Sequence, residues 1–276
     1  MRINRTLRLG MGALAITFAA AACGSGDAET ADIAADGKLT IGIKFDQPGL
    51  GIREEDGSFS GYDVEIAKYV ADKLGVPSDG ITFVEAPSER REEMIVNGEV
   101  DFVVATYSIT DERKAKVDFA GPYFTAGQAL LVRTENTDIT SVWSLNSSTK
   151  LCSVKSSTPA QNVKENYAKD TQLQEFSSYS ECVEALLAGS VDVVTTDDVI
   201  LAGFATQAPG ELKVVGANFS LENYGIGLKK GDDGTRARIN DALEEMMADG
   251  SWENAFEDSI GPLGNSELTP PTLDRY

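Results

Sequence analysis

One stretch of this sequence occurs twice, and the repetition limits the folds open to the chain. Residues 98–106 read GEVDFVVAT, and residues 189–196 read GSVDVVTT. In each copy a glycine ends a helical pattern, and the apolar run that follows is typical of a buried strand. The elements before each copy also come in the same order. We therefore expect two similar α/β lobes; because the match is short, coincidence stays open as the alternative.

The first half alternates short apolar strands with helical patterns. Strands are expected at residues 39–43, 81–84 and 101–105, and helices at 63–74 and 88–97. The second of these helices starts with a serine, which is a good N-cap. Alternation of this kind is typical of a parallel sheet covered by helices.

The second half repeats this order. A strand is expected at residues 150–154, a helix from Thr158, and a second helix at 179–188. Two further strands join the halves: residues 129–133 carry the chain into the second lobe, and residues 224–228 bring it back. Two lobes joined by two hinge crossings predict an α/β clamshell. The expected division places residues 38–126 and 225–276 in lobe 1 and residues 127–224 in lobe 2.

The chain begins with the pattern of a secretory signal peptide. Three arginines precede an apolar run at residues 9–22, and Cys23 and small polar residues follow. The run is too short to cross a bilayer comfortably. Three alanines before a cysteine resemble the lipobox of bacterial lipoproteins. This resemblance implies cleavage of residues 1–22, lipid on the Cys23 sulfur and a flexible tether at 23–37, with order from Lys38. An ordinary signal peptide is the alternative.

Charge and composition argue against several classes of function. The formal net charge is −20, so the surface repels nucleic acid and anionic lipid headgroups. The sequence contains no histidine, the commonest general base and metal ligand. We expect no catalytic residues, metal or cofactor. In an oxidising compartment Cys152 and Cys182 are most simply a disulfide, with a thiol nucleophile as the rival interpretation.

Polar segments follow the strands where a ligand would lie. Ligands of open parallel sheets bind beyond the carboxyl ends of the strands. Here these places are residues 44–47, 106–110, 155–158 and 197–198, several of which begin helices. Free N–H groups at helix starts attract carboxylates.

Arg113 stands out near one of these segments. It falls in the first turn of the helix expected after Thr110, where a cation opposes the helix dipole. This position indicates another task for the side chain. A surface arginine paired with Asp111 or Glu112 is the alternative.

Residues 106–114, TYSITDERK, and 117–123, VDFAGPY, resemble the signature of the polar amino-acid solute-binding proteins. These are extracytoplasmic receptors of ABC importers. Residues 61–67 and 224–226 are similar to the same family, and the likeness covers residues 38–260. It implies a type II periplasmic-binding-protein-like clamshell, an amino-acid ligand and a membrane permease as partner. We expect a monomer that performs no chemistry.

The resemblance also implies roles for individual residues. Arg113 would bind the ligand's α-carboxylate bidentately, helped by Ser108 and, from lobe 2, by Thr158. Asp197 would bind the α-ammonium, beside the carbonyl of Thr106. Both ends of an amino acid are charged at neutral pH, so each needs a partner once water is excluded.

Specificity would come from the groups that meet the ligand's side chain. Lys44, Ser88 and Arg91 are the candidates. Receptors for glutamate and aspartate look similar here, because they have basic residues at the places that match Lys44 and Arg91. The loop at 46–51 resembles the glutamate-binding members of Gram-positive bacteria. We therefore expect glutamate or aspartate as the ligand. Pairing of a solvated Arg91 with a neighbouring glutamate is the alternative.

The group that covers the ligand's methylenes is less evident. Many family members place an aromatic residue after the first strand, but here only Phe45 is nearby. Tyr62 and Tyr107 are other candidates, although core or hinge packing is the expectation for both.

Three alternative functions stay open at this point. The first is a receptor of the same class for glutamine, asparagine or another polar amino acid. The second is a dehydratase-like enzyme on this scaffold. The third is a sensory module for a membrane kinase or channel.

Overall fold

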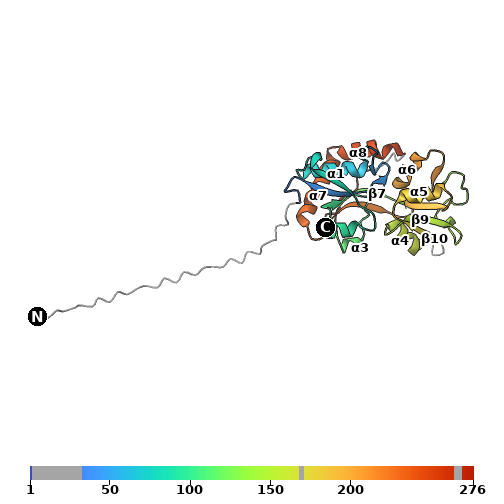
Figure 1. Ribbon diagram of the computed structural model, residues 1–276, viewed down its shortest axis with the longest axis horizontal. Helices are drawn as coiled ribbons and strands as arrows, with labels where there is room; N and C mark the ends of the chain where they lie inside the picture. The colour runs from blue at the N-terminus through green and yellow to red at the C-terminus, as the bar shows by residue number, and fades with distance from the viewer. Residues whose placement is uncertain (2–32, 168–170, 264–268) are drawn as a thin grey trace. The chain divides into compact units, whose positions relative to one another are not determined.

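The computed structural model describes residue 1 and residues 33–167, 171–263 and 269–276 (Figure 1). The predicted signal peptide, the lipidation site Cys23 and most of the tether at 23–37 lie outside the described residues. Ile33 and Ala34 pack against the core, ahead of the start of order expected at Lys38. In the described part of the chain, no helix has the length and apolar character needed to cross a membrane.

Lobe 1 is built on a mixed sheet. In the described residues its strand order is β5 (Ile81–Glu85), β1 (Leu39–Ile43), β6 (Phe102–Val103), β13 (Glu222–Leu228) and β7 (Asp118–Ala126). β1 is parallel to β5 and β6, and β13 is antiparallel to β6 and β7. The lobe also holds α1 (Tyr62–Lys73), α2 (Arg91–Val96), α3 (Asp111–Lys114), α7 (Asp233–Ala248), α8 (Ser251–Ser259) and a small sheet of β2 (Asp46–Gln47), β3 (Gly51–Arg53) and β4 (Phe59–Ser60).

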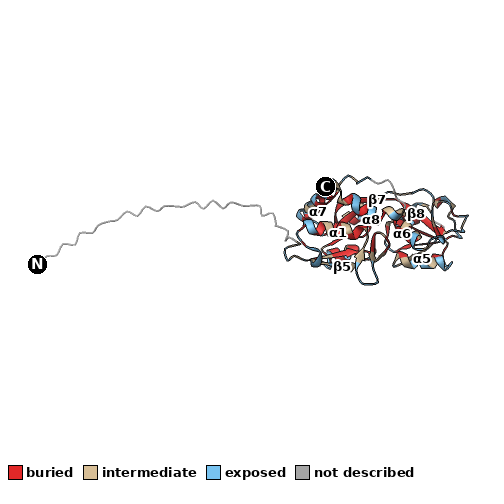
Figure 2. Ribbon diagram, turned by 90° about the horizontal axis from the view of Figure 1, so that it is seen from above, coloured by how far each residue is buried: buried red, intermediate tan, exposed pale blue. Residues whose placement is uncertain are grey.

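Lobe 2 repeats this architecture. Its described strands come in the order β10 (Gln172–Phe176), β9 (Lys150–Val154), β11 (Val193–Asp197), β8 (Gln128–Arg133) and β12 (Leu212–Val215). β9 is parallel to β10 and β11, and β8 is antiparallel to β11 and β12. Its helices include α4 (Thr158–Asn162), α5 (Tyr179–Leu187) and α6 (Asp198–Gln207). Figure 2 shows buried residues along the strands of both lobes.

The two copies of the repeated stretch occupy equivalent places. The copy at 98–106 contributes to β6, between β1 and an antiparallel strand, and the copy at 189–196 contributes to β11, between β9 and an antiparallel strand. The predicted two-lobed α/β fold is therefore confirmed. The strands predicted to be parallel are parallel in both lobes, and the strands next to the crossings, β13 and β8, add antiparallel neighbours to each sheet.

The chain passes twice between the two five-stranded sheets. The chain leaves lobe 1 between β7 and β8, at Gly127, and returns between β12 and β13. Glu222 in β13 pairs with Ala126 in β7, so residues 222–224 belong to the sheet of lobe 1. The division that we expected at residue 225 thus falls inside a strand.

Two helix starts differ from the sequence analysis. The helix α2 begins at Arg91, and the Ser88 hydroxyl accepts a hydrogen bond from Lys44 Nζ at 3.0 Å instead of capping the helix. Ser157, rather than Thr158, caps α4, and its Oγ accepts from the Ala160 N–H at 3.2 Å. Both differences leave Ser88 and Thr158 free of a capping role.

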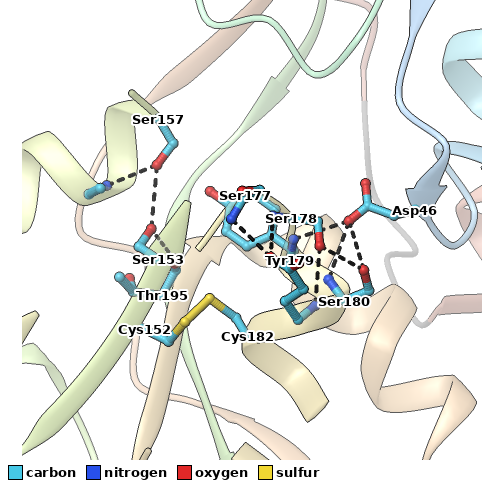
Figure 3. The surroundings of a disulfide bond; sticks show 12 residues. Asp46, Cys152, Ser153, Ser157, Ser177, Ser178, Tyr179, Ser180, Cys182 and Thr195 are labelled. Carbon is cyan, nitrogen blue, oxygen red and sulfur yellow. Dashed lines mark hydrogen bonds between the residues drawn. A yellow bond between two sulfur atoms is a disulfide. The ribbon is translucent and has the colours of Figure 1, made fainter. Parts of the chain in front are cut away.

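The predicted disulfide is present. Cys152 in β9 and Cys182 in α5 are bonded, with their Cα atoms 5.6 Å apart (Figure 3). The bond fastens α5 to the sheet of lobe 2. It also excludes the interpretation of either cysteine as a nucleophile in this oxidised form.

Candidate ligand-binding site

A small pocket lies where the two lobes meet, beyond the carboxyl ends of β6 and β11. From lobe 1 it is lined by Ser88, Arg91 and Thr106, and from lobe 2 by Ser157, Thr158, Pro159, Tyr179, Thr196, Asp197 and Ile200. A wider depression shares Ser157 and Thr158 with this pocket, and Arg113 and Glu222 also line it. The topology therefore brings residues from five separate parts of the sequence to one place.

The remaining predicted residues lie next to the small pocket. Ser108 Oγ is 3.2 Å from Thr158 Oγ1, a hydrogen bond between the lobes. The Ser108 carbonyl accepts from Arg113, and Lys44 bonds to Ser88. All eight predicted ligand-binding residues are thus within one connected cluster, although Lys44, Ser108 and Arg113 do not line the small pocket itself.

Unpaired polar atoms gather at this pocket. In the part of the chain that the structure describes, the buried side-chain atoms without a hydrogen-bond partner include Arg91 Nε, Thr196 Oγ1 and Asp197 Oδ1. All three residues line the small pocket. Buried polar atoms are almost always paired, because leaving one unpaired costs about 1–3 kcal/mol. Their concentration here marks the pocket as the place where a polar ligand would complete the bonding.

Arg113 reaches both lobes from its position in α3. Its Nη1 donates to the Ser108 carbonyl at 2.8 Å, its Nη2 donates to the Ser156 carbonyl at 3.3 Å, and its Nε lies 3.4 Å from Glu92 Oε1. Each terminal nitrogen carries two N–H groups, so one on each remains for a ligand. Arg113 is buried, which contradicts the interpretation of a surface arginine paired with Asp111 or Glu112.

Arg91 is the more deeply buried of the two arginines. Its Nη1 donates to the Ala105 carbonyl at 2.8 Å, and its guanidinium lies 4.2 Å from the centre of the Tyr107 ring. Arg113 lies 5.0 Å from the same ring. Tyr107 therefore makes cation–π contacts with both arginines, which is a packing role rather than the covering of a ligand. Burial, and then the charge of Arg113, lower the pKa of Arg91 to about 10.

Lys44 adds a third cation beside these arginines. Burial, and then the charge of Arg91, lower the pKa of Lys44 to about 7. In the described residues, neither Lys44 nor Arg91 forms an ion pair with a carboxylate. Of these three basic side chains, Arg113 alone forms an ion pair in the described part of the chain, its contact with Glu92.

Thr106 has an unusual backbone that is fixed by its neighbours. Its φ is +46°, a left-handed conformation that is uncommon outside glycine. Its N–H donates to Asp63 Oδ2 at 2.8 Å, and its hydroxyl donates to Gln47 Oε1 at 3.1 Å. The Asp63 carboxylate also accepts from the Tyr123 hydroxyl at 2.7 Å. Burial raises the pKa of Asp63 to about 6, although the hydrogen bonds from Tyr123 and Thr106 act in the opposite direction and favour the charged form.

Asp197 lies at the carboxyl end of β11. Its Oδ2 accepts a hydrogen bond from the Tyr224 hydroxyl, while its Oδ1 has no partner. Burial, and then the nearby charge of Glu222, raise the pKa of Asp197 well above its ordinary value. A cation beside Oδ1 would lower this pKa again and stabilise the charged carboxylate. The arrangement therefore suits an ammonium group.

Sequence reasoning missed Tyr179, Thr196 and Ile200, which line the pocket from lobe 2. The internal repeat carries the signal that would have found two of them. Thr196 precedes Asp197 at a strand end, and α5, which starts at Tyr179, occupies in lobe 2 the place that α2 has in lobe 1. Of the aromatic residues considered earlier, Tyr62 packs in the core against Tyr123, Phe124 and Trp252, and Phe45 packs against Phe59.

Comparison with known proteins identifies the family. Residues 39–261 match the model of the bacterial extracellular solute-binding proteins, family 3. A glutamate-binding protein GluB of Corynebacterium efficiens is 46% identical over 251 residues, which cover 87% of this chain and 85% of that protein. A glutamine-binding protein GlnH of Bacillus subtilis is 37% identical over 221 residues, covering 80% of each chain.

A solved structure agrees with these relatives. An ancestral arginine-binding protein bound to glutamine has a TM-score of 0.76 and 36% identity, covering 82% of this chain and 98% of that one. The named relatives are solute-binding proteins and not enzymes, so a dehydratase-like activity has no support. With the matching family model, the shared fold and these relatives, the chain belongs to the bacterial extracellular solute-binding proteins of family 3.

Proposed function

We propose that this protein binds an acidic L-amino acid, glutamate or aspartate, and delivers it to the permease of an ABC importer. The observation that carries the proposal is that two buried basic side chains, Lys44 and Arg91, form no ion pair within the described residues. Buried charges are stable only when they are paired. A ligand with two carboxylates and one ammonium supplies the missing anions.

The α-carboxylate belongs with Arg113 in this proposal. The two remaining N–H groups of its guanidinium match a carboxylate bidentately. Ser108 and Thr158, already bonded to each other across the lobes, would add hydroxyl groups from both sides. The α-ammonium belongs with Asp197, whose Oδ1 is unpaired, and with the carbonyl of Thr106 in the same pocket.

The side-chain carboxylate belongs with Arg91, Ser88 and Lys44. Arg91 Nε is buried without a partner, and Ser88 lines the pocket while bonded to Lys44. Tyr179, Pro159 and Ile200 supply apolar surface for the ligand's methylenes. The glutamate-binding name of the Corynebacterium relative supports the same choice.

The charge state of Lys44 provides the test. Raising the pH from about 6.5 to about 8.5 is expected to weaken glutamate binding by about tenfold or more, and glutamine binding far less. The reason is that Lys44, with its pKa lowered to about 7, loses its proton above neutral pH in the free protein, and a carboxylate ligand must recover that proton. Calorimetry with both amino acids across this range measures the difference.

Lys44→Met is the matched control, because it keeps the length of the side chain and removes the titration. It should flatten the glutamate profile until it is parallel to that of glutamine. A wild-type glutamate profile as flat as the glutamine profile would contradict the role of Lys44. Tighter binding of glutamine than of glutamate at pH 6.5 would favour the second candidate, a glutamine receptor, which the relative from Bacillus subtilis suggests.

We propose further that lipid on Cys23 anchors the mature protein outside the cell membrane. The lipobox-like alanines before Cys23 support this, and so does the family's extracellular location. Cys23→Ser should release the protein from membranes into the medium, as measured by fractionation of cells that produce it. Retention of this variant in the membrane fraction would rule out the anchor.

A further inference from the structure

The segment of residues 46–50 belongs to lobe 1 but makes direct contacts with lobe 2. It follows β1 and Lys44, and it includes the strand β2. The Asp46 carboxylate points at the amino-terminal end of α5 (Figure 3). Its Oδ2 accepts from the Tyr179 N–H at 3.1 Å, from the Ser180 N–H at 3.3 Å and from the Ser180 hydroxyl at 3.4 Å. One carboxylate thus makes three bonds across the interface between the lobes.

The amino-terminal end of α5 lacks acceptors of its own for these two N–H groups. Ser178 Oγ accepts from the Glu181 N–H at 3.3 Å, and Glu181 Oε2 accepts from the N–H groups of Ser177 at 3.0 Å and Ser178 at 3.3 Å. This capping box leaves the N–H groups of Tyr179 and Ser180 for Asp46. A carboxylate at this position also interacts favourably with the helix dipole.

A second contact of the same segment involves backbone atoms alone. Gly203 in α6 approaches the Pro48 carbonyl so closely that a Cβ at this glycine would lie 2.3 Å from the oxygen. Distances this short do not occur, so only glycine allows the approach. Between these contacts, Gln47 is buried and accepts a hydrogen bond from the Thr106 hydroxyl at 3.1 Å.

The segment therefore connects three parts of the binding machinery. It is continuous with Lys44, it supports Thr106 in the pocket, and it holds α5, whose first residue Tyr179 lines that pocket. The Cys152–Cys182 disulfide fastens α5 to β9. Hydrogen bonds from Asp46 to α5 therefore connect lobe 1 to the sheet of lobe 2.

We propose that Asp46 is a cross-lobe latch, a positioning residue that stabilises the closed arrangement without touching the ligand. When the lobes separate, Asp46 loses the N–H groups of Tyr179 and Ser180, and water takes its place. The three bonds then contribute to the closed state alone. Because the ligand is enclosed only in that state, an interaction that favours closure raises the affinity for every ligand by the same factor.

This proposal differs from a purely electrostatic effect of Asp46 on the pocket. The charge of Asp46 raises the pKa of Lys44, although burial and Arg91 outweigh it. Loss of that charge would make Lys44 less protonated and would weaken the binding of acidic ligands selectively. Loss of a latch weakens glutamate and glutamine equally, and it does so by faster dissociation.

The test compares Asp46→Asn with the wild type in the full chain. Stopped-flow and calorimetric measurements should give dissociation about ten- to a hundredfold faster for both L-glutamate and L-glutamine, since bonds to charged groups are lost. The melting temperature of the ligand-free protein should stay close to that of the wild type. Asp79→Asn is the matched control, because Asp79 is exposed on lobe 1. This variant should bind both amino acids as the wild type does.

Gly203→Ala tests the same inference independently. Alanine favours the helix, so lobe 2 should fold, but its Cβ meets the Pro48 carbonyl only when the lobes are closed. This variant should also speed the dissociation of both ligands. Three results would each overturn the latch. The first is a wild-type dissociation rate in both variants, the second is an affinity that falls for glutamate alone, and the third is an affinity that falls because association is slower.

The latch rests on the proposed function only in requiring an enclosed amino acid. If the wild type binds neither glutamate nor glutamine, the proposed specificity fails. The same comparison of Asp46→Asn and Gly203→Ala is then made with whichever of the twenty amino acids raises the wild-type melting temperature. The expected factor is the same, because a latch acts on closure and not on the ligand's side chain.

Discussion

Replacing Arg113 with alanine is expected to weaken amino-acid binding by about a hundred- to several-thousandfold. Removing one partner of a buried charge pair costs about 3–5 kcal/mol, since the other charge stays buried without compensation. In this protein the loss has two parts. The ligand's carboxylate loses its bidentate partner, and Glu92 loses the cation that lies 3.4 Å away. Calorimetry of purified Arg113→Ala with L-glutamate measures the effect.

Arg113→Lys separates charge from geometry in the same experiment. Lysine keeps the positive charge but cannot donate to the Ser108 and Ser156 carbonyls and to a carboxylate in one plane. Its affinity should therefore fall between those of the wild type and the alanine variant. Binding by Arg113→Ala that is within about threefold of the wild type would show that the carboxylate lies elsewhere.

Replacing Arg91 with glutamine should change the selectivity of the protein rather than remove binding altogether. We expect glutamate to lose about a hundredfold in affinity and glutamine to lose less than about tenfold, because only glutamate has a charge that needs Arg91. Glutamine at position 91 keeps a donor near the Ala105 carbonyl, which the arginine now bonds at 2.8 Å. The ratio of the two dissociation constants is the measured quantity.

The neighbouring Arg90 supplies a matched control for Arg91. It is exposed and pairs with Glu99 at 2.9 Å on the surface of lobe 1. Arg90→Gln makes the same change in charge and composition, yet both affinities should stay as in the wild type. If Arg91→Gln lowered the affinities for glutamate and glutamine by the same factor, this arginine would lie outside the site of the distal carboxylate.

Hydrophobic periodicity and glycine positions predicted several strands and helices correctly. The strand at 39–43 and the helices starting near residues 62 and 179 follow from periodicity and from glycines just after the helix ends. The helix expected at 88–97 was too long by a turn at its start. The reason is tertiary: the Ser88 hydroxyl bonds to Lys44, which follows β1, instead of to the backbone of its own helix.

The candidate site was predictable only in part. Strand ends pointed to Thr106, Thr158 and Asp197, which line the pocket. The partners of Arg113 were not predictable, because Glu92 and Ser156 come from another helix and from the other lobe. Asp46 is the clearest example, since its three bonds cross to residues more than a hundred positions away in the sequence.

The amino-acid order by itself determined the two-lobed plan, the disulfide pair and the cationic residues that end at one cleft. It could do so because hydrophobic periodicity, helix caps, an internal repeat and the presence of two cysteines can all be recognised from residue types and their order. Only the tertiary structure decided which cations remain unpaired, which hydroxyls are buried without partners and how the lobes bond to each other. Burial and pairing depend on what the rest of the chain places within a few ångströms, and no stretch of sequence contains that information on its own.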